Sequence, residues 1–140
     1  MKVSSATTEI NASPETIWGL LTDASKYPEW DPGMVRLEGK VALGEKITAH
    51  TKATDRAFPV TVSEFVPNRK MVWSSGMPLG LFKGARTFTL EPLDKGLVKF
   101  KVEEIFTGLL LPLIGRTIPD LNPTFAAFAK GLKERAEQSV

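Results

Sequence analysis

The sequence predicts an α+β fold built from an antiparallel sheet and a long C-terminal helix. Between residues 34 and 107 apolar side chains recur with a period of two, and short turn sequences separate the segments. Short connections join consecutive strands in antiparallel order. Residues 122–138 instead carry apolar side chains at steps of three and four, which is typical of a helix lying on an apolar surface. At 140 residues we expect one domain, spanning residues 1–140.

One strand and two short helices are expected before the main part of the sheet. Residues 3–11 are rich in Thr, Ser and Ile and predict a first strand. Ser13 and Pro14 form a cap-then-proline start, which predicts a helix over residues 14–22. Residues 24–32 contain two prolines and two aromatic side chains, so we expect a turn of helix and then a rigid loop.

Six further strands and the final helix complete the expected order. The turn sequences between the strands are rich in Gly, Pro, Asp and Asn. Asn122 and Pro123 repeat the cap-then-proline start, and residues 109–116 begin a helical segment that Pro119 should interrupt. The predicted strands are 34–40, 45–54, 58–66, 70–75, 85–91 and 97–107.

Composition excludes several kinds of function. The chain has no cysteine, which excludes disulfides, thiolate metal sites and cysteine nucleophiles. Its net charge is +2 without a basic stripe, so we expect no nucleic-acid partner. No apolar run is long enough to cross a bilayer, and no secretory signal is evident, so we expect no transmembrane segment and a cytoplasmic location. With one His and no carboxylate cluster at ligand spacing, we expect neither a metal nor a cofactor.

The turn at residues 94–96 fixes the register of the last two strands. Asp-Lys-Gly fits a three-residue hairpin loop with glycine in the left-handed position. Residues whose numbers sum to 190 should then lie opposite each other, which pairs Arg86 with Glu104. Apolar pairs fall on one face and opposite charges on the other, as cross-strand energetics favours.

This register places Arg86 and Glu104 on the apolar face, among Phe88, Phe100 and Phe106. Burying either charge without its partner would cost on the order of several kcal/mol. We therefore expect the two side chains to pair. Two interpretations stay open. The pair is a structural ion pair that fixes the register, or it is a polar anchor for a bound ligand.

The order of elements and several local sequences resemble the SRPBCC superfamily, which includes START-like, Bet v 1-like and polyketide cyclase/dehydrase-like proteins. The resembling segments are residues 10–18, Asp23, and residues 27–30, 104–108 and 132–137. The resemblance spans nearly the whole chain. It implies the helix-grip fold, in which a curved antiparallel seven-stranded sheet wraps the C-terminal helix and encloses a hydrophobic cavity.

The resemblance also implies an apolar ligand such as a lipid, a polyketide or a quinone-like compound. It favours binding over catalysis here, because polyketide cyclases rely on polar side chains in the cavity and this chain has few. Two alternatives stay open: a cyclase/dehydratase-type enzyme using Glu104 and Arg86, and an interaction domain similar to Hsp90-activator-like relatives. A homodimer is left open too. The residues expected to contact ligand are Arg86, Glu104, Phe88, Phe100, Phe106, Trp30, Tyr27, Leu81, Phe125 and Phe128.

Two further features of the sequence bear on function. His50 shares its strand parity with Lys46 and Lys52, so we expect it to face water rather than act as a base. Residues 76–84 hold three glycines and several apolar side chains. They form either a mobile flap that lines an entrance with residues such as Leu81 or a plain connection between strands.

Overall fold

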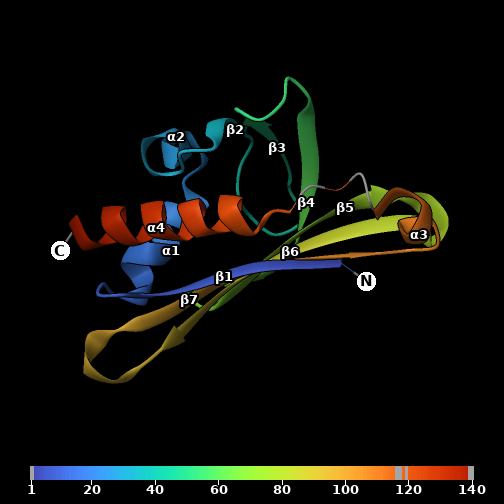
Figure 1. Cartoon of the computed structure of the whole chain (residues 1–140). Coiled ribbons are helices and arrows are strands. Elements are labelled where there is room, and N and C mark those ends of the chain that lie inside the picture. The colour runs from blue at the N-terminus through green and yellow to red at the C-terminus, as the bar shows by residue number, and fades with distance from the viewer. Residues whose placement is uncertain (1, 116–117, 119, 139–140) are drawn as a thin grey trace.

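The fold is a curled antiparallel sheet with a long helix on its concave face (Figure 1). The computed structural model describes residues 2–115, 118 and 120–138. The elements are β1 (Lys2–Ile10), α1 (Pro14–Thr22), α2 (Tyr27–Trp30), β2 (Met34–Glu38), β3 (Lys46–Thr51), β4 (Ala57–Val66), β5 (Lys70–Met77), β6 (Phe82–Pro92), β7 (Val98–Thr107), α3 (Leu111–Ile114) and α4 (Asn122–Gln138).

The sheet has seven strands in the order β1-β7-β6-β5-β4-β3-β2, and every neighbouring pair is antiparallel. Strands β2 to β7 therefore form the predicted meander, and the predicted helix-grip fold is confirmed. β1 is the edge strand beside β7, with Lys2 opposite Phe106 and Ile10 opposite Val98. Hence the first and last strands of the chain are neighbours.

The helix boundaries follow the predicted capping sequences. The Ser13 hydroxyl oxygen accepts a hydrogen bond from the Thr16 backbone N–H at 3.1 Å, and α1 begins at Pro14 as expected. At the start of α4 the Asn122 side-chain oxygen accepts its hydrogen bond from a strand rather than from the helix. Its Oδ1 accepts from the Ser5 backbone N–H at 2.8 Å and so ties the helix to β1.

The segment between β5 and β6 is a hairpin rather than a flap. Gly76 pairs with Lys83 and Met77 with Phe82, so the strands continue past the predicted ends and residues 78–81 form the turn. A Cβ at Gly76 would lie 2.3 Å from the Phe82 carbonyl oxygen. The glycine therefore permits close strand pairing, and of the two interpretations the structure agrees with the plain connection between strands.

Between β7 and α4 the described residues include the short helix α3 (Leu111–Ile114). α3 lies within the predicted helical segment of residues 109–116, and Gly115 after it still has helical backbone angles; residue 116 lies outside the described residues. Pro119, at the predicted interruption, lies outside the described residues. α4 matches its predicted range, and its Phe125, Phe128 and Leu132 are buried against the sheet at 1%, 4% and 0% exposure.

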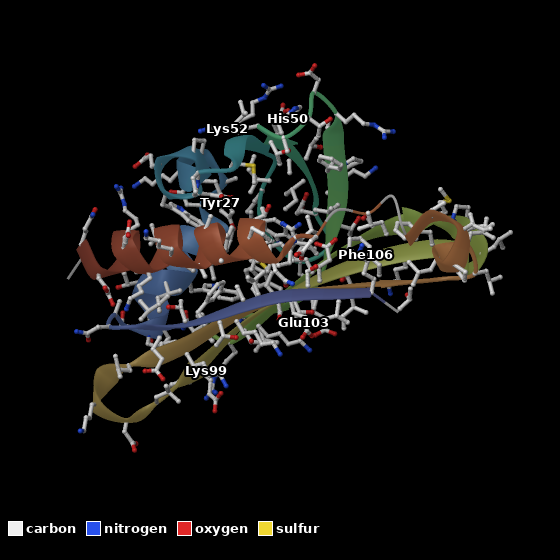
Figure 2. All side chains as sticks on the ribbon, viewed as in Figure 1. Tyr27, His50, Lys52, Lys99, Glu103 and Phe106 are labelled. Carbon is white, nitrogen blue, oxygen red and sulfur yellow. The ribbon has the colours of Figure 1, made fainter. Side chains whose placement is uncertain are left out.

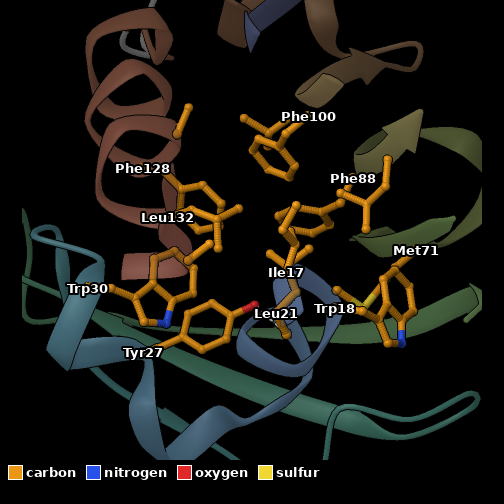
Figure 3. Close-up of a cluster of buried hydrophobic side chains, with 14 of the residues drawn as sticks. Ile17, Trp18, Leu21, Tyr27, Trp30, Met71, Phe88, Phe100, Phe128 and Leu132 are labelled. Carbon is orange, nitrogen blue, oxygen red and sulfur yellow. Dashed lines mark hydrogen bonds between the residues drawn. The ribbon is translucent and has the colours of Figure 1, made fainter. Parts of the chain in front are cut away.

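The core lies between the concave face of the sheet and helices α1, α2 and α4. Figure 3 shows its centre, where Phe128 and Leu132 of α4 meet Phe88 and Phe100 of the sheet, with Tyr27 and Trp30 of α2 beside them. No helix in the described part of the chain is long and apolar enough to span a membrane.

Candidate functional site

Arg86 and Glu104 form an ion pair across β6 and β7. The two residues are opposite each other, as the predicted register requires. Arg86 Nε donates to Glu104 Oε1 at 2.7 Å, and the side chains are 29% and 13% exposed. The pairing predicted from the hairpin turn is confirmed.

The turn itself explains why the register is fixed. Lys95 and Gly96 both adopt left-handed backbone angles, with φ of 63° and 77°. The Leu93 N–H donates to the Leu97 carbonyl oxygen at 2.7 Å and closes the loop. On the outer face Glu91 then meets Lys99. Figure 2 shows Lys99 and Glu103 pointing away from α4, so the opposite parity faces the helix.

Arg86 points toward α4. Its guanidinium carbon lies 4.8 Å from the centroid of the Phe125 ring, which is within the range of a cation–π contact. Phe125 belongs to the first turns of α4 and is almost fully buried. The ion pair therefore lies on the concave face beneath the start of the helix.

Polar groups also lie on both sides of the ion pair, so that four neighbouring strands carry a polar row made of Ser4, Glu104, Arg86 and Trp73. Ser4 of β1 is opposite Glu104 and is only 3% exposed. Trp73 of β5 is opposite Arg86, and its buried indole Nε1 has no hydrogen-bond partner among the described residues. Neither residue was predicted to belong to the site. No turn links β1 to its partner strand, and a single Trp in a strand is typical of the core, so no sequence signal marks either residue as part of the site.

This row presents unused hydrogen-bond donors to an apolar surface. An arginine side chain has five N–H donors, and within the described part of the chain only Nε of Arg86 donates to a protein oxygen. Gly84 makes room beside the pair, because a Cβ there would lie 3.1 Å from the Phe106 ring and 3.4 Å from Glu104 Oε2. A ligand with hydrogen-bond acceptors fits such a group of donors.

Two buried titratable groups lie near the row, at α2. Burial, followed by the nearby Asp31 carboxylate, raises the pKa of Tyr27 well above its ordinary value. The Tyr27 hydroxyl donates to the Leu21 carbonyl oxygen at 2.6 Å. Burial also raises the pKa of Asp31, although the Gly33 N–H bond and the charges of Arg86 and Lys52 oppose this shift. Tyr27 is therefore a neutral donor already bound to the backbone.

The predicted ligand-contact residues fall into two groups. The packed group makes ring contacts at centroid distances of 4.7 to 6.3 Å around Phe128 and Tyr27. The open group is partly exposed, and Figure 2 shows Phe106 beyond the start of α4, toward α3. Contact of either group with a ligand stays a prediction. The packed group is Tyr27, Trp30, Phe88, Phe100 and Phe128, and the open group is Arg86, Glu104, Phe106 and Leu81. The tenth predicted residue, Phe125, is buried and lies between the two groups, against Arg86.

Other places in the described structure offer less chemistry. A shallow surface groove of about 500 Å³ lies between the turn after β1 and the turn between β6 and β7, and its lining holds no charged side chain. Within the described ranges no three His, Asp or Glu side chains gather as metal ligands would. The internal cavity that the resemblance implies stays a prediction.

His50 is on the same face as Arg36 and Glu38, away from the core, as its parity predicted. Its side chain is nevertheless only 20% exposed, because the ring is hydrogen-bonded to the Glu38 carboxylate. This bond lowers the pKa of Glu38. The expectation that His50 simply faces water was therefore incomplete, although it lies on the face opposite to the Arg86–Glu104 pair.

Comparison with known proteins adds a family to this geometry. A family model described as polyketide cyclase/dehydrase and lipid transport matches residues 1–137. No protein of curated function matches the chain.

Several solved structures share the fold. A START superfamily protein from Mycobacterium smegmatis is 21% identical, with 99% of each chain covered and a TM-score of 0.74. The Aha1 dimer from Colwellia psychrerythraea is 20% identical, with 98% and 97% covered and a TM-score of 0.73. The ZhuI aromatase/cyclase from Streptomyces is 12% identical, with 98% and 94% covered and a TM-score of 0.73. At these identities the likeness establishes the fold alone.

Proposed function

Because the chain belongs to the polyketide cyclase/dehydrase and lipid transport family of the SRPBCC superfamily, we propose that it binds an apolar small molecule that has one polar end. The apolar part lies against the open group on the concave face, near Phe106 and the start of α4. The polar end accepts hydrogen bonds from Arg86. The observation that carries this proposal is the inward guanidinium group, whose terminal nitrogens donate to no oxygen of the described residues.

Electrostatics favours a ligand with an acceptor or anionic end. The Arg86 side chain is 29% exposed, and its bond to Glu104 uses only one of its five N–H donors. A carboxylate or carbonyl oxygen would satisfy the remaining donors through charge-assisted hydrogen bonds. Trp73 Nε1 adds one more unused donor on the neighbouring strand.

The placement of the acid–base groups supports binding rather than catalysis. Tyr27 keeps its proton and donates a hydrogen bond to the Leu21 carbonyl oxygen, while His50 lies on the opposite face. A general acid or base must lie within hydrogen-bond reach of the reacting group. Glu104 is held by Arg86, so both members of the pair are suited to orienting a ligand.

A dye-displacement assay with matched ligands tests the proposal. A hydrophobic fluorophore bound to the protein is displaced by a long-chain fatty acid or by the alcohol of equal chain length. Arg86→Met should weaken the fatty acid about tenfold or more and leave the alcohol nearly unchanged, since a hydrogen bond to a charged group contributes about 1.5–3 kcal/mol. Lys99→Met removes a positive charge from the outer face and is the matched control.

Two results would contradict the proposal: absence of dye binding at saturation, or equal weakening of acid and alcohol by Arg86→Met. Native mass spectrometry of the protein purified from its own host provides an independent measurement. We expect a co-purified small molecule in the wild-type protein and less of it in the Arg86→Met variant.

A further inference from the structure

Four large apolar side chains are exposed together at one end of the sheet. They come from the turn between β5 and β6 and from the segment around α3, which Figure 1 shows beyond the N-terminal end of α4. Backbone hydrogen bonds from Leu109 to Gly80 and from Leu110 to Leu81 hold the two segments together. We call these four residues the leucine tip. They are Met77, Leu79, Leu109 and Leu113, exposed by 50%, 91%, 75% and 77%.

The backbone fixes this exposure. Leu79 has a φ of 61°, a left-handed conformation that leucine rarely adopts. Gly108 has a φ of 128°, and a Cβ there would lie 2.6 Å from the Leu81 carbonyl oxygen. The two segments therefore meet closely, with their leucines directed outward rather than toward the core. Local strain of this kind often accompanies function.

The two segments that carry the leucine tip contain basic residues and no acidic ones. Residues 76–84 contain Lys83 and no acidic residue, and residues 105–118 contain Arg116 and no acidic residue. The remaining sixteen Lys and Arg side chains balance the sixteen Asp and Glu side chains of the chain. The whole formal net charge of +2 thus belongs to the two segments that carry the leucine tip.

We propose that the leucine tip docks on an anionic lipid bilayer. Exposed leucines flanked by positive charge match a surface with an apolar interior and negatively charged headgroups. Reversible membrane attachment commonly needs both signals together. A second copy of the chain fits less well, because two apposed tips would bring the Lys83 side chains of both copies together, and residues 76–84 and 105–118 contain no acidic side chain to pair with them.

This surface goes beyond the proposed ligand site, and the two are tested separately. Docking would place the open end of the concave face, with Phe106 and the Arg86–Glu104 pair, next to the bilayer. Membrane attachment itself requires neither Arg86 nor a bound ligand. Arg86→Met should therefore leave vesicle binding unchanged, whereas the tip variants should leave dye binding in the absence of vesicles unchanged.

Vesicle co-sedimentation tests the docking surface. The wild-type protein should bind vesicles of phosphatidylcholine with roughly one third phosphatidylserine, bind phosphatidylcholine alone more weakly, and lose affinity with added salt. The triple variant Leu79→Ser, Leu109→Ser, Leu113→Ser should bind at least about tenfold more weakly. The control triple variant Val35→Ser, Leu43→Ser, Val66→Ser removes exposed apolar side chains elsewhere and should bind like wild type.

An inserted probe gives a second readout that does not depend on removing side chains. Tryptophan introduced by Leu79→Trp should shift its emission to shorter wavelength when anionic vesicles are added, whereas Leu43→Trp should not. The three native tryptophans are buried and form a constant background.

Three outcomes would overturn the proposal. Equal vesicle binding by the tip and control variants shows that the leucines do not insert. Absence of an emission shift for Leu79→Trp shows the same for the turn. Loss of a dimer in sedimentation experiments by the tip variant, without an effect on vesicles, assigns the tip to a second copy of the chain.

Discussion

The two ends of the concave face differ in how side chains are used. At the packed end, the aromatic side chains of α2, α4 and the sheet cover one another, and Tyr27 and Phe100 have no exposed surface. At the open end, an ion pair, the partly exposed Phe106 and the leucine tip follow one another along β6, β7 and α3. The packed end therefore supplies most of the stability, and the open end keeps surface for other molecules.

Both ends hold donors that no described residue accepts, but they differ in exposure: Trp30 Nε1 at the packed end is buried, whereas the Arg86 side chain at the open end is partly exposed. The buried Tyr27 hydroxyl at the packed end is bound to a backbone carbonyl oxygen. At the open end Arg86 keeps donors that no oxygen of the described residues accepts. A partly exposed donor beside an apolar surface can be reached by a ligand, whereas a donor covered by the aromatic core cannot.

The largest difference should appear between two phenylalanine truncations. Phe128→Ala removes the ring that contacts Tyr27, Trp30, Phe88 and Phe100, and should lower the free energy of unfolding by about 3–5 kcal/mol. Phe106→Ala removes a partly exposed ring stacked on Phe82 and should cost less than about 2 kcal/mol. Urea denaturation measures both, and equal losses would contradict the division into two ends.

The ion pair should give a smaller loss. Glu104→Gln leaves Arg86 charged and poorly compensated in a partly buried place, so we expect a loss of about 1–2 kcal/mol. Replacing the pair by Arg86→Met with Glu104→Leu should be nearly neutral, because no charge is then left without its partner. A double variant that loses more than the single variant in urea denaturation would contradict this expectation.

Asp31 should affect the pH dependence of stability by less than about 1 kcal/mol. Burial raises its pKa in the folded state, so the native protein holds this proton more tightly than the unfolded chain. Its contribution therefore falls as pH rises from the ordinary pKa of 3.8 through the raised value. Asp31→Asn should flatten this part of a thermal-denaturation profile and slightly stabilise the protein at neutral pH. A steeper pH dependence of stability in the variant would contradict this prediction.

The smallest effect should come from the turn in the leucine tip. Leu79→Gly relieves a left-handed φ and should raise the free energy of unfolding by up to about 0.5 kcal/mol, since glycine also gains freedom in the unfolded chain. The same variant should bind anionic vesicles more weakly. A gain in stability together with weaker vesicle binding would show that Leu79 serves membrane binding rather than stability. A loss of stability would indicate that Leu79 packs usefully at the tip.

Local signals predicted much of the fold and one part of the site. The turn at residues 94–96 fixed the pairing of Arg86 with Glu104, because hairpin register depends on a few adjacent residues. Ser4 was missed, since the strand opposite β1 lies far along the chain and no turn links them. The hairpin at residues 76–84 stayed ambiguous, because glycine serves both in mobile loops and where strands approach closely.

The pairing of β1 with β7 also imposes an order of assembly. β6 and β7 are joined by a tight turn and can form quickly, whereas Lys2 meets Phe106 only after the intervening chain is arranged. Glu104 thus meets Arg86 within the hairpin before Ser4 arrives to cover its other side. We expect β1 to pair with β7 late in folding. Ser4 would then join Glu104, Arg86 and Trp73 only in the last step of sheet formation.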